Sequence, residues 1–129
     1  MNTLNRGKAI SAGKHIATID GDDLAMNFRF EKQVQFLAEQ SDYGLLGTWM
    51  ERFGERKTTW RYPTGDTAMR LAVLIDNPIG HPSVMFRRGW DHGGPGYNDE
   101  AFAYAEDFEY RFRISALWKC ENLPEALTL

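Results

Sequence analysis

The chain has 129 residues with a formal net charge of −3; 43% of the residues are hydrophobic and 13% are aromatic. This composition excludes intrinsic disorder, which requires low hydrophobicity and high net charge, and the length predicts one domain spanning residues 1–129. The single cysteine, Cys120, excludes an internal disulfide and a zinc ribbon, and it indicates a reducing compartment, which we take to be the cytoplasm. The first fifteen residues hold no apolar run like that of a secretory signal, and no segment has the length of apolar sequence that a membrane span needs.

The first thirty residues predict a β-hairpin that follows a loose tail. Residues 1–12 are small and polar, which is typical of a loose N-terminal tail. Asp20-Gly21 is a turn dipeptide between two runs with strand character, so we expect strands at about 14–19 and 23–30. The alternating apolar residues of the second run should face the core: Leu24, Met26, Phe28 and Phe30.

Two helices are predicted after the hairpin. Phe30, Val34 and Leu37 follow the i, i+4, i+7 spacing of an amphipathic helix, which we place at about 31–40. A second helix is expected to begin at Ser41 or Asp42 and to end before Gly54. Its apolar stripe would consist of Leu45, Leu46, Trp49, Met50 and Phe53.

The middle of the chain predicts one further helix and one short strand. Asp66 is a favourable N-cap for a helix over about 66–76, although the continuous apolar run inside this segment also fits a buried strand. Residues 83–87 predict a short strand after the Gly-His-Pro breaker at positions 80–82.

The C-terminal part predicts a long strand at about 107–118. Its apolar residues share one parity, so a strand would place them all on the inner face: Phe108, Tyr110, Phe112 and Ile114. Arg111 and Arg113 would then lie on the wetter face, and the residues after Cys120 would form a short tail. The predicted fold is therefore α+β, with an antiparallel sheet of hairpin, short strand and C-terminal strand packed against two or three helices.

The segment WDHGGPGYNDE, residues 90–100, is the first candidate site. His81, Asp91 and His92 offer metal ligands, but their spacing matches neither a calcium loop nor a zinc protease motif. The glycines would instead let the loop settle against a partner. The residues expected to make that contact are Trp90, Asp91, Tyr97, Asp99, Glu100 and Glu106, most of them within an acidic patch.

The segment 52–62 is the second candidate site, because it places basic residues beside aromatic rings as in proteins that bind single-stranded nucleic acid. The residues concerned are Arg52, Arg56, Lys57, Trp60 and Arg61. A solvated helix end explains the same pattern, and an acidic chain repels phosphate elsewhere on its surface.

The sequence favours a protein without enzymatic activity and without a cofactor. The stretch GKAISAGKH at 7–15 departs from the phosphate-binding loop in spacing and in its last residue, and no nucleophile elbow is present. We therefore expect an inhibitor, accessory or immunity-type factor, such as phages and mobile elements carry, that docks a larger host protein or nucleoprotein. A metal-dependent enzyme using the 90–100 loop and a nucleic-acid-binding module using 52–62 are the alternatives.

Overall fold

The computed structural model describes residues 3–54, 57–90, 96 and 105–129. The helices are α1 (Thr3–Ile10), α2 (Arg29–Glu39), α3 (Asp66–Ala72) and α4 (Glu106–Ser115), with a 3₁₀ turn η1 (His81–Ser83). The strands are β1 (His15–Ala17), β2 (Tyr43–Arg52), β3 (Thr58–Trp60), β4 (Met85–Arg87) and β5 (Lys119–Thr128). The predicted α+β class is confirmed, since these elements form one small domain around a five-stranded sheet.

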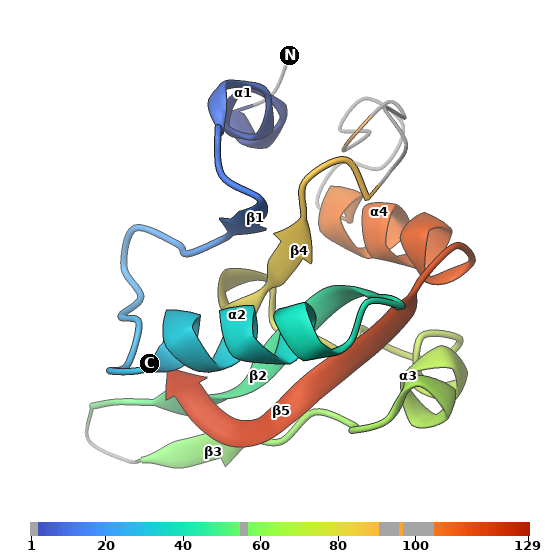
Figure 1. The fold of residues 1–129 in the computed structure, drawn as a ribbon. Coiled ribbons are helices and arrows are strands. Elements are labelled where there is room, and N and C mark those ends of the chain that lie inside the picture. The colour runs from blue at the N-terminus through green and yellow to red at the C-terminus, as the bar shows by residue number, and fades with distance from the viewer. Residues whose placement is uncertain (1–2, 55–56, 91–95, 97–104) are drawn as a thin grey trace.

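The sheet is mixed, and β2 is its central strand. β4 and β3 pair with β2 in antiparallel direction at its two ends, β5 runs parallel to it along nearly its whole length, and β1 extends the sheet beyond β4 (Figure 1). The expected purely antiparallel sheet is thus corrected. A parallel partner for β2 is possible because the chain between the two strands is long enough to make the crossover.

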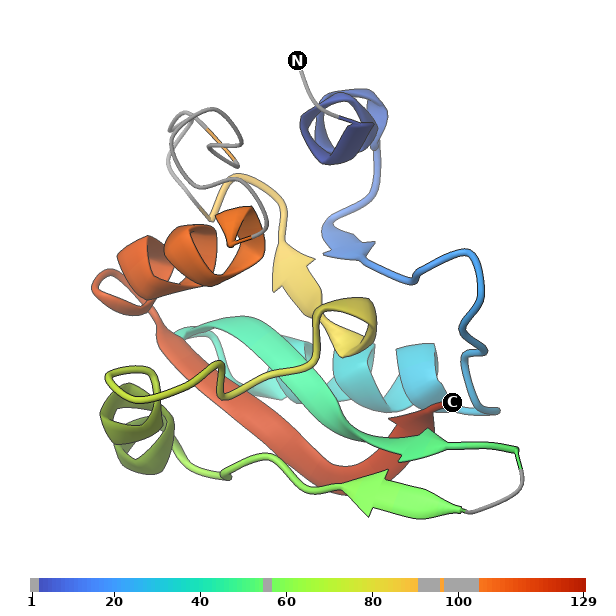
Figure 2. The same cartoon turned by 180° about the vertical axis from the view of Figure 1, so that it is seen from behind.

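Two apolar clusters lie on opposite faces of the sheet. Neighbouring strand residues alternate in direction, so Leu45 and Phe86 belong to one cluster, while Leu46 and Met85 belong to the other with Leu37 of α2. The views from front and back agree: α2 covers one face, and α3 and α4 lie toward the other (Figure 2). The larger cluster includes Trp90 and residues of α3, α4 and β5.

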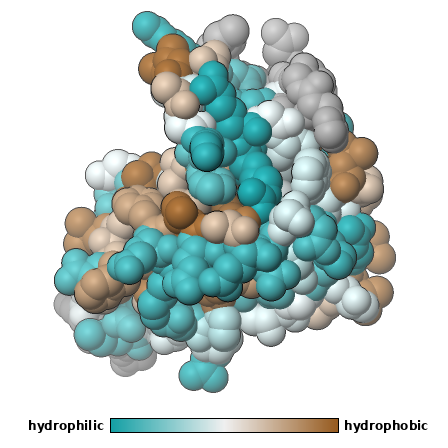
Figure 3. Space-filling model, in the orientation of Figure 1, coloured by the Kyte–Doolittle hydropathy of each residue, from teal (hydrophilic) through white to brown (hydrophobic). Residues whose placement is uncertain are grey.

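The predicted hairpin is wrong. Residues 15–17 do form a strand, but their partner is β4, with Ile16 opposite Phe86. Residues 23–28 run as a loop that makes a single bridge, from Ala25 to Thr128. The side chains expected in the core are exposed and gather near the start of α2 (Figure 3): Leu24 56%, Met26 41%, Phe28 67% and Phe30 46%.

The second predicted helix is also wrong, because residues 43–52 form β2. Gly44 and Gly47 permit this strand to be buried on both faces: a Cβ at Gly44 would lie 2.7 Å from Trp118, and one at Gly47 would lie 2.3 Å from Asn122 Oδ1. A short continuous apolar run fits a buried strand as well as a helix, and here packing decided for the strand.

The predicted strand at 107–118 is wrong as well, since most of it is α4. Tyr110 and Ile114 are buried at helical i, i+4 spacing, whereas Phe112 is 50% exposed. Arg111, expected on the wetter face, is only 6% exposed. The last long strand is β5, in the segment expected to be a short tail.

Three predictions about local structure are confirmed. The helix expected at 31–40 is α2, and the segment 66–76 contains the helix α3 rather than a buried strand. The strand expected at 83–87 is β4, preceded by η1.

The predicted loose tail is corrected in part. Residues 3–10, expected in that tail, form α1, none of whose residues is buried.

Candidate functional site

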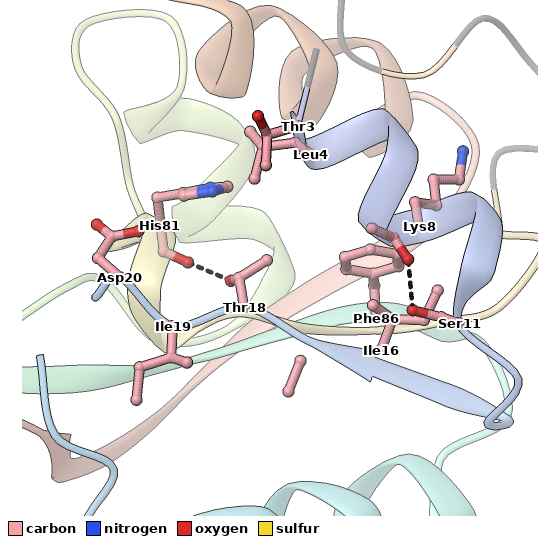
Figure 4. A pocket seen from close by; sticks show the side chains of 12 residues that line it. Thr3, Leu4, Lys8, Ser11, Ile16, Thr18, Ile19, Asp20, His81 and Phe86 are labelled. Carbon is pink, nitrogen blue, oxygen red and sulfur yellow. Dashed lines mark hydrogen bonds between the residues drawn. The ribbon is translucent and has the colours of Figure 1, made fainter. Parts of the chain in front are cut away.

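Two adjoining cavities open where β1 and η1 meet, and both are lined by Asp20 and His81. The first, which we call the α1 cavity, has a volume of about 240 Å³ and lies between α1 and β1 (Figure 4). The second, the acidic cavity, has a volume of about 360 Å³. Its walls are formed by Asp20, Asp22, Asp23, Met50, Trp60, Tyr62, Asn77, Ile79, Gly80, His81 and Pro82.

The α1 cavity has an apolar floor and a fixed rim. Ile16 and Phe86 come from the paired strands β1 and β4, so the sheet holds them in place. Thr18 Oγ1 donates a 2.5 Å hydrogen bond to the His81 carbonyl oxygen, which joins the end of β1 to η1 (Figure 4). The half-buried His81 is thereby held at the border between the two cavities.

Three carboxylates face the acidic cavity from the loop between β1 and α2. The amide of Asp23 donates to the Asp20 carbonyl at 3.2 Å, and this turn holds Asp20, Asp22 and Asp23 close together. Burial, followed by the charges of Asp20 and Asp22, raises the pKa of Asp23 above the usual value of a carboxyl group. The loop therefore offers a dense set of hydrogen-bond acceptors and an electrostatic attraction for cations.

The opposite wall of the acidic cavity is aromatic and amide-bearing. The Trp60 side chain is 49% exposed, and burial raises the pKa of Tyr62, whose carbonyl accepts a 2.9 Å hydrogen bond from Trp49 Nε1. Asn77 Oδ1 accepts a 2.9 Å hydrogen bond from Nη1 of Arg111.

Arg111 joins this wall to α4. Its guanidinium also donates to the Ile79 carbonyl at 2.5 Å and forms an ion pair with Asp107, one turn earlier on the helix. This buried network fixes the chain that bears Asn77, Ile79 and Gly80.

The loop expected to dock a partner lies mostly outside the described residues. Asp91, His92, Tyr97, Asp99 and Glu100 are all outside them, and the side chain of Glu106 is not described either. Trp90 is described, and it is only 1% exposed. Its ring stacks on Phe86, with 5.1 Å between the ring centres, and its Nε1 donates to the Tyr110 hydroxyl at 3.0 Å. The Trp90 side chain is therefore packed in the core and is not exposed for contact with a partner.

Of the three residues named as alternative metal ligands, the structure describes only His81. His81 lines both cavities, but Asp91 and His92 are outside the described residues. Within the part of the chain that is described, no three His, Cys, Asp or Glu side chains converge as a group that could hold a metal ion.

Of the basic and aromatic residues predicted in 52–62, those that the structure describes are exposed: Arg52, Lys57, Trp60 and Arg61. Lys57 pairs with Glu51 at 3.3 Å, and the Arg61 guanidinium lies 5.4 Å from the centre of the Trp49 ring. Arg52 lies at the exposed end of β2, Arg56 is outside the described residues, and Trp60 faces the acidic cavity.

Sequence reasoning missed the main residues of the acidic cavity. Asp20-Gly21 is interpreted above as a hairpin turn and Asp23 as the start of its second strand, although three carboxylates shortly after a strand are a signal of a site at the end of that strand. Tyr62 and Asn77 give no such signal, because only the fold brings them opposite the carboxylates.

No helix among the described residues is long and apolar enough to cross a membrane.

Comparison with known proteins gives matches along nearly the whole chain. An uncharacterized glycosyltransferase of Haemophilus influenzae is 27% identical over 138 aligned positions, covering 98% of this chain and 43% of that protein. The amylovoran biosynthesis glycosyltransferase AmsE of Erwinia amylovora is 29% identical over 133 positions, covering 96% of this chain and 49% of that protein. An uncharacterized glycosyltransferase of Methanocaldococcus jannaschii is 39% identical over 46 positions, 36% of this chain and 16% of that protein. No protein-family model matches the sequence.

These matches contradict the prediction of a non-enzymatic inhibitor or immunity-type factor from a phage or mobile element. The two relatives that align with almost the entire chain are both named as glycosyltransferases. The chain spans less than half the length of each of them.

Proposed function

We propose that this chain is part of a glycosyltransferase and that its acidic cavity binds a sugar-bearing substrate. The observation that carries the proposal is the similarity to two glycosyltransferases along 98% and 96% of the chain. The chemistry of the cavity supports it independently. Because the sole cysteine is a buried free thiol, we also propose that the protein works in a reducing compartment such as the cytoplasm.

A sugar presents hydroxyl groups around its edge and C–H groups on its face. Carboxylates at Asp20, Asp22 and Asp23 accept hydrogen bonds from hydroxyl groups, and such charge-assisted bonds are stronger than neutral ones. The exposed indole of Trp60 on the opposite wall offers an apolar surface for the face of the ring. The two walls therefore match the two kinds of sugar surface.

Sugar transfer breaks the bond from the anomeric carbon to a leaving group and forms a bond from that carbon to an acceptor oxygen. The acceptor hydroxyl passes its proton to a base, a role that a carboxylate of the cavity can fill, and the leaving group departs with the electron pair of the broken bond. In a donor activated by phosphate, the departing group is anionic, and carboxylates facing it repel it unless a cation lies between them. The described residues do not by themselves form a group that could hold a metal ion, so such a cation would have to bind together with the substrate. Binding is therefore best measured with and without a divalent metal.

The proposal is tested by NMR titration of the isotope-labelled chain. The probes are UDP-glucose, UDP alone and glucose alone, each with and without Mg²⁺, so that contacts to the sugar and to the diphosphate are separated. Binding of UDP-glucose should shift the amide signals of Asp22, Asp23 and Tyr62. Failure of all three probes to shift these signals at millimolar concentration would overturn the proposal.

Two matched variants sharpen the titration. Asp22→Asn should raise the dissociation constant at least about tenfold, since a hydrogen bond to a charged group contributes about 1.5–3 kcal/mol. Glu39→Gln makes the same chemical change at the exposed end of α2, away from both cavities, and should leave the constant unchanged.

A further inference from the structure

Two separate segments of the chain form the wall of the acidic cavity opposite the carboxylates. The first segment, residues 60–63, carries Trp60 and Tyr62, and the second segment, residues 77–82, carries Asn77. Tyr62 and Asn77 belong to no helix or strand, so the pairing of strands does not fix the distance between the two segments. A contact from elsewhere in the fold has to hold that distance if the wall is to match a substrate.

The side chain of Asn122, in β5, makes such a contact. Asn122 is 0% exposed, and its Nδ2 donates one hydrogen bond to the Pro63 carbonyl at 2.8 Å and another to the Pro78 carbonyl at 2.9 Å. Pro63 directly follows Tyr62, and Pro78 directly follows Asn77. One amide group therefore ties the two wall segments together next to the residues that line the cavity.

The surroundings of Asn122 fix the orientation of its amide. If the oxygen and the nitrogen were exchanged, an acceptor would face two carbonyl oxygens, so Nδ2 must be the atom between the segments. Oδ1 then lies over Gly47, where a Cβ would be 2.3 Å from it and 2.4 Å from Ile79 Cγ1. The missing side chain at Gly47 thus leaves the room in which Asn122 reaches the second segment.

The buried amide of Asn122 is not explained by packing. Its Oδ1 has no hydrogen-bond partner among the described residues, although the residue is fully buried. Buried polar groups are normally paired, because an unpaired one loses its interaction with water and gains nothing in return. The two bonds that the nitrogen makes to the wall segments are therefore what the amide contributes at this position.

Other side chains hold each segment separately. Trp49 Nε1 donates to the Tyr62 carbonyl in the first segment at 2.9 Å. Arg111 of α4 donates to the Ile79 carbonyl in the second segment at 2.5 Å. These bonds anchor the segments to β2 and to α4, whereas Asn122 is bonded to both segments at once and so acts on the distance between them.

We propose that Asn122 is a positioning residue for the acidic cavity. By joining Pro63 to Pro78, it sets the spacing between the first and second segments, and with it the shape of the wall that meets the sugar. Asn122 does not line the cavity, so it acts through the two segments and not by touching the substrate. The role of the wall in sugar binding rests on the proposed function, but the bridge itself rests on the two hydrogen bonds.

The bridge is tested first without a ligand. In the wild type, NMR scalar couplings across the hydrogen bonds should link Asn122 Nδ2 to the carbonyl carbons of both Pro63 and Pro78. The Tyr62 ring should also show nuclear Overhauser contacts to Gly80, because a Cβ at Gly80 would lie 2.9 Å from the Tyr62 hydroxyl oxygen. Asn122→Leu has a similar shape but no donor, and in this variant the contacts between Tyr62 and Gly80 should be lost.

The effect on binding is measured with UDP-glucose and with UDP, each with Mg²⁺. Asn122→Leu should raise the dissociation constant for UDP-glucose about three- to tenfold, the range expected when the ring contact of the wall is lost. The dissociation constant for UDP should not change, because UDP lacks the sugar that the wall meets. Asn122→Ser has a side chain too short to span both carbonyls, and it should show the same split if the leucine variant does not fold.

Thr48→Val is the matched control. Thr48 is also 0% exposed, and its hydroxyl donates to the Trp49 carbonyl at 2.9 Å within β2. Valine has nearly the same shape as threonine and removes this buried hydroxyl, while the bonds of Asn122 to the wall segments stay in place. The control should lower the melting temperature and leave both dissociation constants unchanged.

Three results would overturn the positioning role. The first is the absence of couplings from Asn122 to the two carbonyls, and the second is an unchanged contact between Tyr62 and Gly80 in the folded Asn122→Leu variant. The third is an equal loss of affinity for UDP-glucose and UDP. If the wild type binds neither probe, the proposed function fails, while the couplings and the ring contacts still decide whether Asn122 sets the spacing of the wall.

Discussion

The buried guanidinium of Arg29 donates a 2.9 Å hydrogen bond from Nη2 to the carbonyl oxygen of Thr18, the residue that follows β1. Arg29 is 0% exposed, and its Nε donates to Gln33 Oε1 at 3.2 Å. Burial lowers the pKa of Arg29 to about 10 against the opposing effect of Asp23. One side chain at the start of α2 therefore fixes the strand end from which the acidic loop departs.

Removing this guanidinium should destabilise the fold strongly. Arg29→Met removes the donor from the buried acceptor of Gln33 and from the half-buried carbonyl of Thr18, and a buried acceptor left unsatisfied costs about 1–3 kcal/mol. We expect a loss of about 2 kcal/mol or more in the free energy of unfolding, measured in urea. Lys32→Met removes the Lys32–Glu125 pair, whose side chains are 40% and 47% exposed, and should cost less than about 1 kcal/mol. Equal losses for the two variants would contradict the role given to Arg29.

Phe28 should be a site where glycine stabilises the protein. Its φ is 66°, in the left-handed region, and the side chain is 67% exposed, so the ring contributes little packing to offset the backbone strain. Phe28→Gly should raise the free energy of unfolding by up to about 1 kcal/mol. Removing the Cβ relieves a backbone strain of about 1–2 kcal/mol, and the larger conformational entropy that glycine loses on folding offsets part of this gain. Phe28→Ala keeps the Cβ and should change stability by less than about 0.5 kcal/mol. A large loss for the alanine variant in thermal unfolding would place the ring in the core after all.

The two glycines Gly47 and Gly7 should respond to alanine in opposite directions. A Cβ at Gly47 would lie 2.3 Å from Asn122 Oδ1 and 2.4 Å from Ile79 Cγ1, and overpacking of this kind costs about 1–3 kcal/mol. A Cβ at Gly7, inside α1, meets nothing within 4 Å, so Gly7→Ala should gain about 0.5–1 kcal/mol from helix propensity. Chemical denaturation of both variants measures the difference, and a tolerated Gly47→Ala would contradict the close packing of β2 with β5.

Cys120 should make stability fall at high pH. Burial raises the pKa of its thiol from 9.0 to about 12, so the unfolded chain releases the proton at lower pH than the folded one. The stabilising contribution is fully present below pH 9 and is lost as pH rises from 9 toward 12, by about 1.4 kcal/mol per pH unit in that range. Unfolding curves of the wild type and Cys120→Ala, each from pH 8 to 10.5, isolate this contribution as the change in their difference. A difference that stays constant with pH would show that the thiol is not held neutral by the fold.

Trp60 should matter for binding and not for folding. Its half-exposed ring lines the acidic cavity from β3, whose residues are all exposed. Trp60→Ala should weaken UDP-glucose binding by about three- to tenfold, since a ring contact of this kind is worth about 0.5–1.5 kcal/mol, while the melting temperature changes little. Trp60→Phe keeps a flat ring and should retain most of the affinity. Unchanged binding in Trp60→Ala, followed by NMR titration, would remove the indole from the proposed sugar site.

Local signals in the sequence were sufficient where one interpretation was physically dominant. The i, i+4, i+7 spacing predicted α2 because the alternative would have placed its apolar residues on both faces of a strand. The Gly-His-Pro breaker at positions 80–82 marked the start of the next segment, and this predicted the strand β4. The composition indicated a folded domain with a core, and the presence of both helix and strand patterns indicated the α+β class; this is what the sequence alone determined.

Tertiary contacts decided the elements whose patterns allow two interpretations. The run Leu45–Met50 became a strand because β4, β3 and β5 all pair with β2, a partnership that no local pattern reveals. In α4, alternate and i, i+4 positions are both apolar. The helix prevailed where Arg111 pairs with Asp107 one turn earlier and donates to Asn77 across the fold. β5 looked like a tail because it contains Asn122 and Pro124, yet Asn122 is 0% exposed and donates to the Pro63 and Pro78 carbonyls at 2.8 and 2.9 Å.

The acidic cavity also combines a feature that is visible in the sequence with one that only tertiary contacts produce. The carboxylates at 20–23 are adjacent in sequence and could have been recognised there as a site. Their counterparts Trp60, Tyr62 and Asn77 come from segments about forty to fifty-five residues further along the chain. Only the pairing of β1 with β4 and of β3 with β2 brings these walls together, because the free energy of burying the core, rather than any local preference, selects which distant segments meet.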